Sequence, residues 1–189
     1  MKTYFFFALL LSLSVLNAQN NLDNTWIFGY SYDTPYTLYQ GSLVNFENSS
    51  PIVNSQIVGI FMDFANTSMC DTEGNLLYYT NGRYVGDAEH NIMANGDSLN
   101  LDYMLGSSAY LILTQGVITV PMPGSPGQYY LFHSGMITIT PEGILNVASH
   151  PLFYSVVDMT DPDYPLGIIK EKNTVILSDT LDTGKLTMT

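Results

Sequence analysis

The chain has 189 residues, with 17 acidic and only 5 basic side chains, so its formal net charge is −12. That balance argues against nucleic acid as a partner, because its phosphates require lysine and arginine, and against electrostatic attachment to anionic lipid. A single cysteine, Cys70, excludes an internal disulfide, and its apolar surroundings favour a buried thiol over a reactive one.

Residues 1–18 have the pattern of a secretory signal peptide. Lys2 precedes an apolar run from Tyr4 to Leu16, and Ala18 offers a small residue before a cleavage point. The run is shorter than the roughly 20 apolar residues of a transmembrane helix, and no later stretch has that length. We therefore expect a secreted or cell-surface protein with no membrane span after signal cleavage. Residues 19–189, about 170 residues, would form one folded region.

Short runs of strand-forming residues alternate with turn signals along this region. Aromatic and β-branched runs predict strands at 25–30, 41–46, 56–64, 76–80, 110–120, 128–134, 136–140, 152–159, 168–172, 174–177 and 186–189. Turn residues cluster at 48–51, 95–96, 121–127, 141–143 and 160–165. No amphipathic helix is predicted. Turn signals every ~8–12 residues are typical of an all-β fold.

Two stretches share one outline: GNLLYYTNG at residues 74–82 and GQYYLFHSG at residues 127–135. From Gly74 to Gly127 the offset is 53 positions, near the roughly 40–50 residues of a propeller blade. The repeat favours a partial β-propeller of antiparallel blades, with a β-sandwich as the alternative. About three such units fit, whereas propellers close with about 4–8 blades. We therefore expect a truncated, N-terminal piece of a longer protein.

The order of several segments resembles a known group of proteins. These segments are TWIFG, CDTEGNLLYYTNG, HNIMANGDSLN, QGVITVPMPGSPGQYYLF, LFYSVVDM and GKLT. Together they resemble the N-terminal β-propeller-like region of large secreted proteins from gliding, type IX-secreting bacteria. The resemblance implies an exported fold, adhesion at the cell surface and no catalytic residues. The chain departs from the group in its loop at 161–165, where a Gly/Asn-rich turn is usual, and shows no sorting domain.

The candidate metal site consists of Asp158, Asp161 and Asp163, which lie at near-alternate spacing on one loop. Ca²⁺ takes six to eight oxygen ligands, and such a loop provides three of them. Pro162 and Pro165 stiffen the loop, and no later glutamate completes an EF-hand pattern. The alternative is that these acidic residues serve solubility. Calcium is the only cofactor that the sequence suggests.

The candidate binding surface is the tyrosine-rich stretch with Tyr30, Tyr32, Tyr36 and Tyr39. Exposed tyrosine rings stack on sugars or anchor a protein partner. The alternative is that these rings pack between sheets.

Catalytic patterns do not emerge from the sequence. His90, His133 and His150 are widely separated and share no zinc-ligand spacing. Gly106-Ser107-Ser108 lacks the second glycine of a nucleophile elbow. We therefore expect a non-enzymatic scaffold or recognition module with a protein or glycan ligand. A glycan-active hydrolase or lyase is the alternative, and a purely structural spacer is a third reading.

Overall fold

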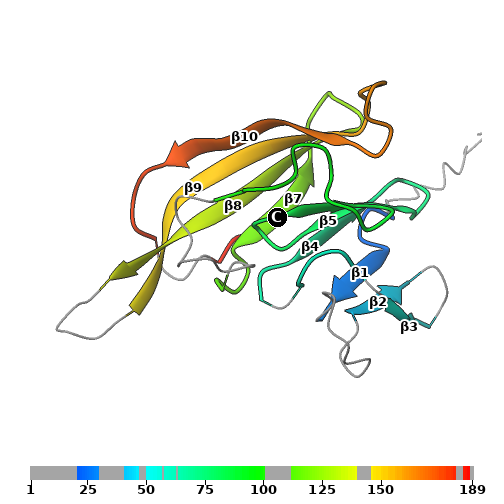
Figure 1. Cartoon of the computed structure of the whole chain (residues 1–189), viewed down its shortest axis with the longest axis horizontal. Helices are drawn as coiled ribbons and strands as arrows, with labels where there is room; N and C mark the ends of the chain where they lie inside the picture. The colour runs from blue at the N-terminus through cyan, green and yellow to red at the C-terminus, as the bar shows by residue number, and fades with distance from the viewer. Residues whose placement is uncertain are drawn as a thin grey trace, which may run out of the picture.

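The computed structural model describes residues 21–29, 41–46, 50–56, 58–62, 64–100, 112–139, 146–181 and 185–187. In these residues every regular element is a β-strand, and the strands form three antiparallel sheets (Figure 1). The all-β prediction is therefore confirmed. The described segments contain no helix with the length and hydropathy that crossing a bilayer requires.

Each sheet is a meander of consecutive strands, and the sheets follow one another along the chain. The first contains β1 (Thr25–Phe28), β2 (Gly41–Asn45) and β3 (Ile52–Gln56). The second contains β4 (Thr67–Cys70), β5 (Leu76–Thr80) and β6 (Val85–Asp87). The third contains β7 (Val117–Pro121), β8 (Gln128–Ile139), β9 (Asn146–Asp158) and β10 (Ile168–Leu177).

The second sheet lies between the other two and is covered on both faces. Side chains alternate across a strand, so Tyr78 and Tyr79 of β5 point to opposite faces, yet both are fully buried. Tyr79 packs in a cluster with Ile27 of the first sheet. Tyr78 meets Tyr129 of the third sheet, with ring centroids 5.6 Å apart, and its hydroxyl bonds to that of Thr119.

The main core lies between the second and third sheets and includes the segments that join them. Its buried members are Ala65, Met69, Tyr78, Val85, Met93, Leu99, Leu113, Val117, Tyr129, Leu131, Met136, Val157 and Ile169. A smaller core between the first and second sheets consists of Ile27, Val58, Ile60, Met62 and Tyr79. Burial of one aliphatic side chain stabilises the fold by about 1.5–3 kcal/mol. The larger hydrophobic contribution therefore comes from the second and third sheets.

The strand predicted at 56–64 is wrong. Val58, Ile60 and Met62 are buried at every second position, as in a strand, but Met62 pairs only in an isolated bridge with Gly29. A Cβ added to Gly59 would lie 2.1 Å from the carbonyl oxygen of His90. The backbone there packs against another loop, a close approach that only glycine permits. The strand in this region is instead β3, which the sequence analysis did not predict.

Other predicted strands change length. The runs at 168–172 and 174–177 form one strand, β10, with register shifts on either side of Glu171 and before Leu177. The strand predicted at 152–159 begins earlier, as β9. The one at 110–120 is reduced to β7, because residues 112–116 form no strand. In residues 185–187 there is no strand, although the Leu186 amide donates to the Gln115 carbonyl at 3.0 Å.

The two stretches with matching glycines contain β5 and β8, the second strand of their respective sheets. Gly74 and Gly127, which open the stretches, have positive φ of 93° and 80°. The strands between them differ in register. In the alignment of the two stretches, Leu131 corresponds to Tyr78. Leu131 is the cross-strand partner of Thr119, and the Thr119 hydroxyl bonds to the Tyr78 hydroxyl. The side chains of Tyr78 and Leu131 therefore face each other between the two sheets. The glycines therefore share a left-handed backbone conformation within a turn, and the strands that follow do not repeat one register.

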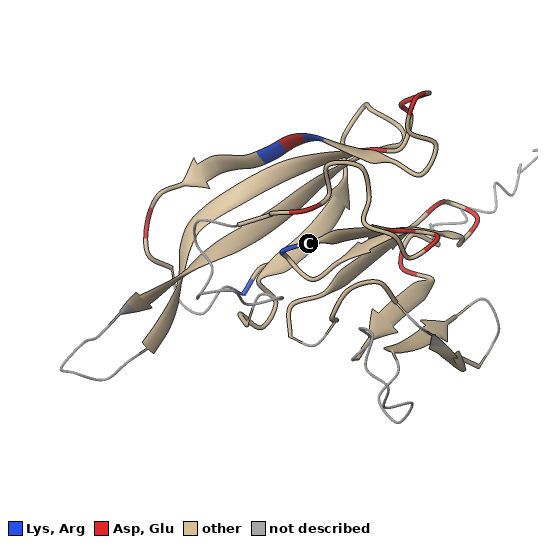
Figure 2. Cartoon of the chain, in the orientation of Figure 1, with Lys and Arg blue, Asp and Glu red and all other residues tan. Residues whose placement is uncertain are grey.

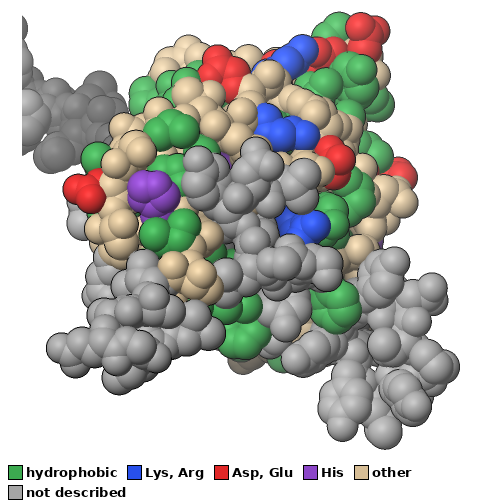
Figure 3. Space-filling model, turned by 60° about the vertical axis from the view of Figure 1, so that its left-hand side comes forward, with side chains coloured by type: hydrophobic (Ala, Val, Ile, Leu, Met, Phe, Trp, Pro, Cys, Tyr) green, Lys and Arg blue, Asp and Glu red, His purple; other side chains and the backbone are tan. Residues whose placement is uncertain are grey.

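Charged side chains lie mainly on loops and on β10 (Figure 2). Basic side chains lie beside acidic ones in the view of Figure 3, and ion pairs join Lys170 to Asp161 and Lys172 to Asp97. Exposed pairs of this kind contribute little stability individually. The ion pair at Asp97 and a parallel bridge between Ala94 and Ile168 hold the loop that contains Ala94 and Asp97 against β10. That loop covers part of an edge that would otherwise expose unpaired backbone groups.

Candidate functional site

The first sheet carries three exposed aromatic side chains on the face turned away from its core. In β1 the buried Thr25 and Ile27 alternate with Trp26 and Phe28, which are 45% and 39% exposed. Phe46 follows β2, is 38% exposed and contacts the indole ring. The second sheet covers only one face of the first, so these rings remain open.

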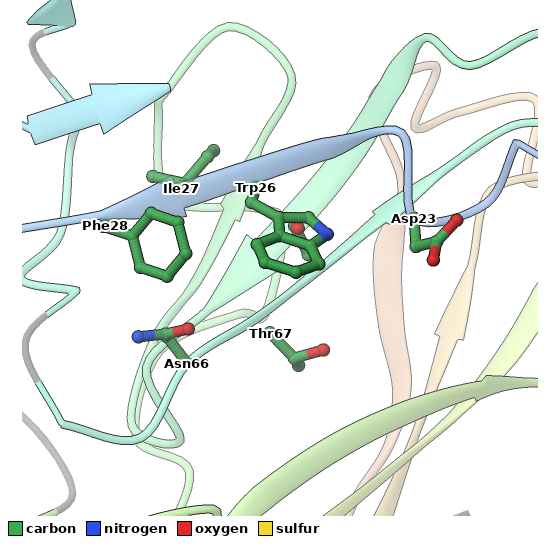
Figure 4. Close-up of a pocket in the computed structure, with 7 residues that line it drawn as sticks. Asp23, Trp26, Ile27, Phe28, Asn66 and Thr67 are labelled. Carbon is green, nitrogen blue, oxygen red and sulfur yellow. The ribbon is translucent and has the colours of Figure 1, made fainter. Parts of the chain in front are cut away.

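A hollow of about 290 Å³ lies between β1 and the segment that leads into and begins β4 (Figure 4). Two contacts fasten that segment to β1. Gly29 and Met62 exchange two backbone hydrogen bonds of 3.1 Å, and the Ser68 hydroxyl donates to the Thr25 carbonyl at 2.6 Å. Side chains line the space between these two points, so the hollow follows from the way the two segments are held together.

The hollow has an aromatic side and a polar side. Trp26 and Phe28 project from β1, Asn66 and Thr67 lie across from them, and Asp23 lies beyond the indole (Figure 4). The Asn66 amide donates a long hydrogen bond of 3.4 Å to the Met62 carbonyl. Within the described residues, no donor is bonded to the Asn66 side-chain oxygen or to the Asp23 carboxylate. Oxygen acceptors are therefore available beside an open aromatic surface.

Trp26 is held in place by its neighbours on the sheet. Its ring makes edge-to-face contacts with Phe28 and Phe46, at centroid distances of 6.0 and 5.0 Å. Such pairs contribute about 0.5–1.5 kcal/mol beyond the area they bury. An aromatic ring already fixed in position loses little conformational entropy when a ligand binds.

A second cluster has the residue types of a catalytic triad, but it is buried. Nδ1 of His133 lies 2.7 Å from Oδ1 of Asn100, and Nε2 lies 2.9 Å from Oγ of Ser155. All three residues are at most 1% exposed, and the Ser155 hydroxyl also accepts the Asn173 amide at 3.1 Å. Burial lowers the pKa of His133 to about 3, so its ring is neutral at pH 7. A substrate cannot reach these atoms unless the core opens, and the cluster therefore serves the fold.

The three aspartates predicted to hold calcium do not come together. The Asp158 carboxylate accepts hydrogen bonds from the Thr160 amide and hydroxyl, at 2.8 and 2.7 Å. Asp161 pairs with Lys170 and accepts the amide of Asp163 at 2.9 Å. In the part of the chain that the structure describes, no three metal-ligating side chains form a group that could hold an ion. The calcium hypothesis rests on sequence spacing alone and stays a prediction.

The predicted tyrosine surface lies outside the described residues. Nothing in the structure bears on Tyr30, Tyr32, Tyr36 and Tyr39, and their role as a binding surface stays a prediction. The hollow at Trp26 was not predicted from the sequence. The alternation in TWIF indicates that two aromatic residues share a face, but only the position of the second sheet decides that this face stays open.

The remaining reactive side chains are accounted for by packing. Cys70 is fully buried, as expected, and burial raises its pKa. His90 has Nδ1 3.2 Å from the Tyr79 hydroxyl, and partial burial lowers its pKa. Neither residue lies at the hollow.

Compared with known proteins, the chain matches no family model, no curated protein and no solved structure. Its function is therefore inferred from the geometry of these two clusters and of the sheets that position them.

Proposed function

We propose that the chain is an exported, non-enzymatic module of β-propeller type that serves as a scaffold or recognition surface outside the cell. The observation that carries this proposal is the second sheet, which has both faces covered. A two-layer sandwich gives each sheet only one covered face. A propeller packs successive antiparallel meanders side by side, so that its inner blades are covered twice.

Contacts between the leading strands support the same arrangement. β1 adjoins β4, and β4 adjoins β7, and each of these is the first strand of its meander. In a propeller, equivalent strands of successive blades surround a central channel. The off-register β5 and β8 indicate that the second and third sheets would be blades of unequal construction.

The open face of the first sheet favours recognition over a purely structural role. Exposed aromatic rings beside polar groups without partners are typical of binding surfaces. Export rests on the signal-peptide pattern of residues 1–18. Adhesion at the cell surface rests on the resemblance to the gliding-protein region.

Adsorption to a panel of immobilised polysaccharides and extracellular proteins tests the proposal. We would compare the wild-type chain with Trp26→Ala and with the control Ile176→Ala, since Ile176 on β10 is 48% exposed, like Trp26. The wild type and the control should be retained on at least one immobilised ligand without degrading it. Trp26→Ala should elute earlier from the same ligand.

Two results would contradict the proposal. Equal retention of all three proteins on every surface would remove the recognition role. Release of new reducing ends or unsaturated sugars from a polysaccharide would instead favour a glycan-active hydrolase or lyase.

A further inference from the structure

We propose that the hollow at Trp26 binds one pyranose ring of an uncharged glycan. This inference rests on the proposed recognition function and names its ligand class. A pyranose presents two different surfaces: a ring face rich in C–H groups and a rim of hydroxyl groups. The hollow presents a matching pair, an open indole with an amide and a hydroxyl group across from it and a carboxylate beyond it (Figure 4).

The aromatic side suits the C–H face of a sugar. The face of an indole ring carries partial negative charge, and aliphatic C–H groups carry partial positive charge, so the two attract each other. Trp26 is 45% exposed even though Phe28 and Phe46 support it. The platform is therefore both accessible and fixed in orientation.

The polar side suits the hydroxyl rim. The Asp23 carboxylate is exposed and has no partner among the described residues, so it can accept charge-assisted hydrogen bonds from sugar hydroxyls. Asn66 offers an amide oxygen as a further acceptor, and among the described residues its side-chain N–H groups donate only to the Met62 carbonyl, at 3.4 Å. The Ser68 hydroxyl donates to the Thr25 carbonyl at 2.6 Å, so it could only accept a hydrogen bond from a sugar.

The negative charge of the site favours uncharged sugars over acidic ones. The lining residues are Asp23, Trp26, Ile27, Phe28, Asn66, Thr67 and Ser68, among which the only ionisable side chain is acidic. The whole chain carries a net charge of −12. Uronic acids and sulfated or sialylated glycans would meet repulsion with no compensating cation.

Size limits the site to one ring. Pockets for drug-sized ligands occupy roughly 300–1,000 Å³, and this hollow, at about 290 Å³, lies at the lower end. The neighbouring units of a glycan would remain in solvent. We expect weak binding of single sugars and stronger retention on polysaccharides that offer many copies of the ring.

Trp26 is the only tryptophan in the chain, so tryptophan fluorescence reports directly on this site. The full chain would be titrated with methyl β-glucopyranoside, methyl α-mannopyranoside and N-acetylglucosamine, and with galacturonic acid as the charged comparison. At least one uncharged sugar should change the emission in a saturable way, and galacturonic acid should not. Asp23→Asn should weaken binding roughly tenfold through loss of a charge-assisted hydrogen bond.

Two controls separate binding from folding. Glu73→Gln removes another exposed carboxylate, on the turn before β5, and should leave the affinity unchanged. Affinity electrophoresis in polysaccharide gels needs no fluorescent reporter. In such gels Trp26→Phe should keep most of the retardation and Trp26→Ala should lose it.

The proposal is overturned if no uncharged sugar alters the emission, if galacturonic acid binds as well as they do, or if Asp23→Asn behaves like Glu73→Gln. A Trp26-dependent adsorption to immobilised proteins without any sugar response would overturn the sugar ligand but keep the recognition function. Adsorption that does not depend on Trp26 would overturn both.

Discussion

Neighbouring large side chains on one strand are buried differently in the first and second sheets. In the second sheet Tyr78 and Tyr79 are both fully buried, because a sheet lies against each face. In the first sheet Ile27 is buried and Trp26 is exposed, because only one face has a neighbour. Whether another sheet covers its face, more than its residue type, decides whether an aromatic side chain stabilises the core or stays available to a ligand.

The largest effect on the free energy of unfolding is expected from a substitution in the main core. Leu131→Ala removes a fully buried side chain of β8 and should lower the free energy of unfolding by about 2–5 kcal/mol. Urea denaturation measures the change. The exposed Ile176→Ala on β10 should shift it by about 0.5 kcal/mol or less. Similar losses in the two variants would contradict the assignment of the core.

Acid should weaken the same region through His133. Its folded-state pKa of about 3 lies below the ordinary value of 6.5, so the unfolded chain binds a proton that the folded chain does not. The contribution of neutral His133 to the free energy of unfolding is therefore fully present above about pH 6.5 and is lost as the pH falls towards about 3. Between pH 7 and pH 5 the free energy of unfolding should decrease by about 2 kcal/mol. Urea denaturation at several pH values should show this slope.

His133→Gln is the matched variant for that measurement, because it keeps a hydrogen-bonding side chain but does not titrate. Its stability should depend much less on pH between 7 and 5. An unchanged slope in His133→Gln would show that other groups cause the acid sensitivity.

The contact between the second and third sheets can be measured on its own. A double-mutant cycle of Tyr78→Phe and Thr119→Val removes each hydroxyl of the buried pair separately and then together. The coupling energy should be about 0.5–1.5 kcal/mol, because each single variant leaves one buried hydroxyl without its partner. Strictly additive effects would mean that the two sheets do not meet at these residues.

A smaller effect on stability than that of Leu131→Ala is expected at the open face. Trp26→Ala should lower the free energy of unfolding by about 1–2 kcal/mol, since it removes two edge-to-face pairs, with Phe28 and Phe46, whose exposed rings place each pair in the lower part of the range of about 0.5–1.5 kcal/mol. Thermal or urea unfolding would show it. A decrease as large as that of Leu131→Ala would mean that this face is covered, and the hollow could not bind a ligand.

The sequence predicted burial better than it predicted partners. Val58, Ile60 and Met62 are all buried as the apolar run indicated, but the run could not tell that Gly59 packs against the His90 carbonyl. β3 escaped prediction because it is an exposed strand and its Asn54 and Ser55 break the apolar run. Hydrophobic patterning reports contact with the core, whereas hydrogen-bonded pairing depends on distant segments.

The sites depend even more on distant segments. His133 and Asn100 are 33 positions apart, and no local spacing predicts their contact. The hollow likewise has Trp26 on one side and Asn66 on the other. The two segments are held together by the hydrogen bonds between Gly29 and Met62 and between Ser68 and Thr25. The aligned stretches at Gly74 and Gly127 predicted a repeated unit, but their strands differ in register, because the aligned Tyr78 and Leu131 face each other.

Quenching of Trp26 emission by acrylamide tests most directly whether the outward face of the first sheet is open. The native chain should show the red-shifted emission of an accessible indole and strong quenching, reduced when a bound sugar covers the ring. A blue-shifted emission that acrylamide hardly quenches would place the indole inside the protein and contradict the account.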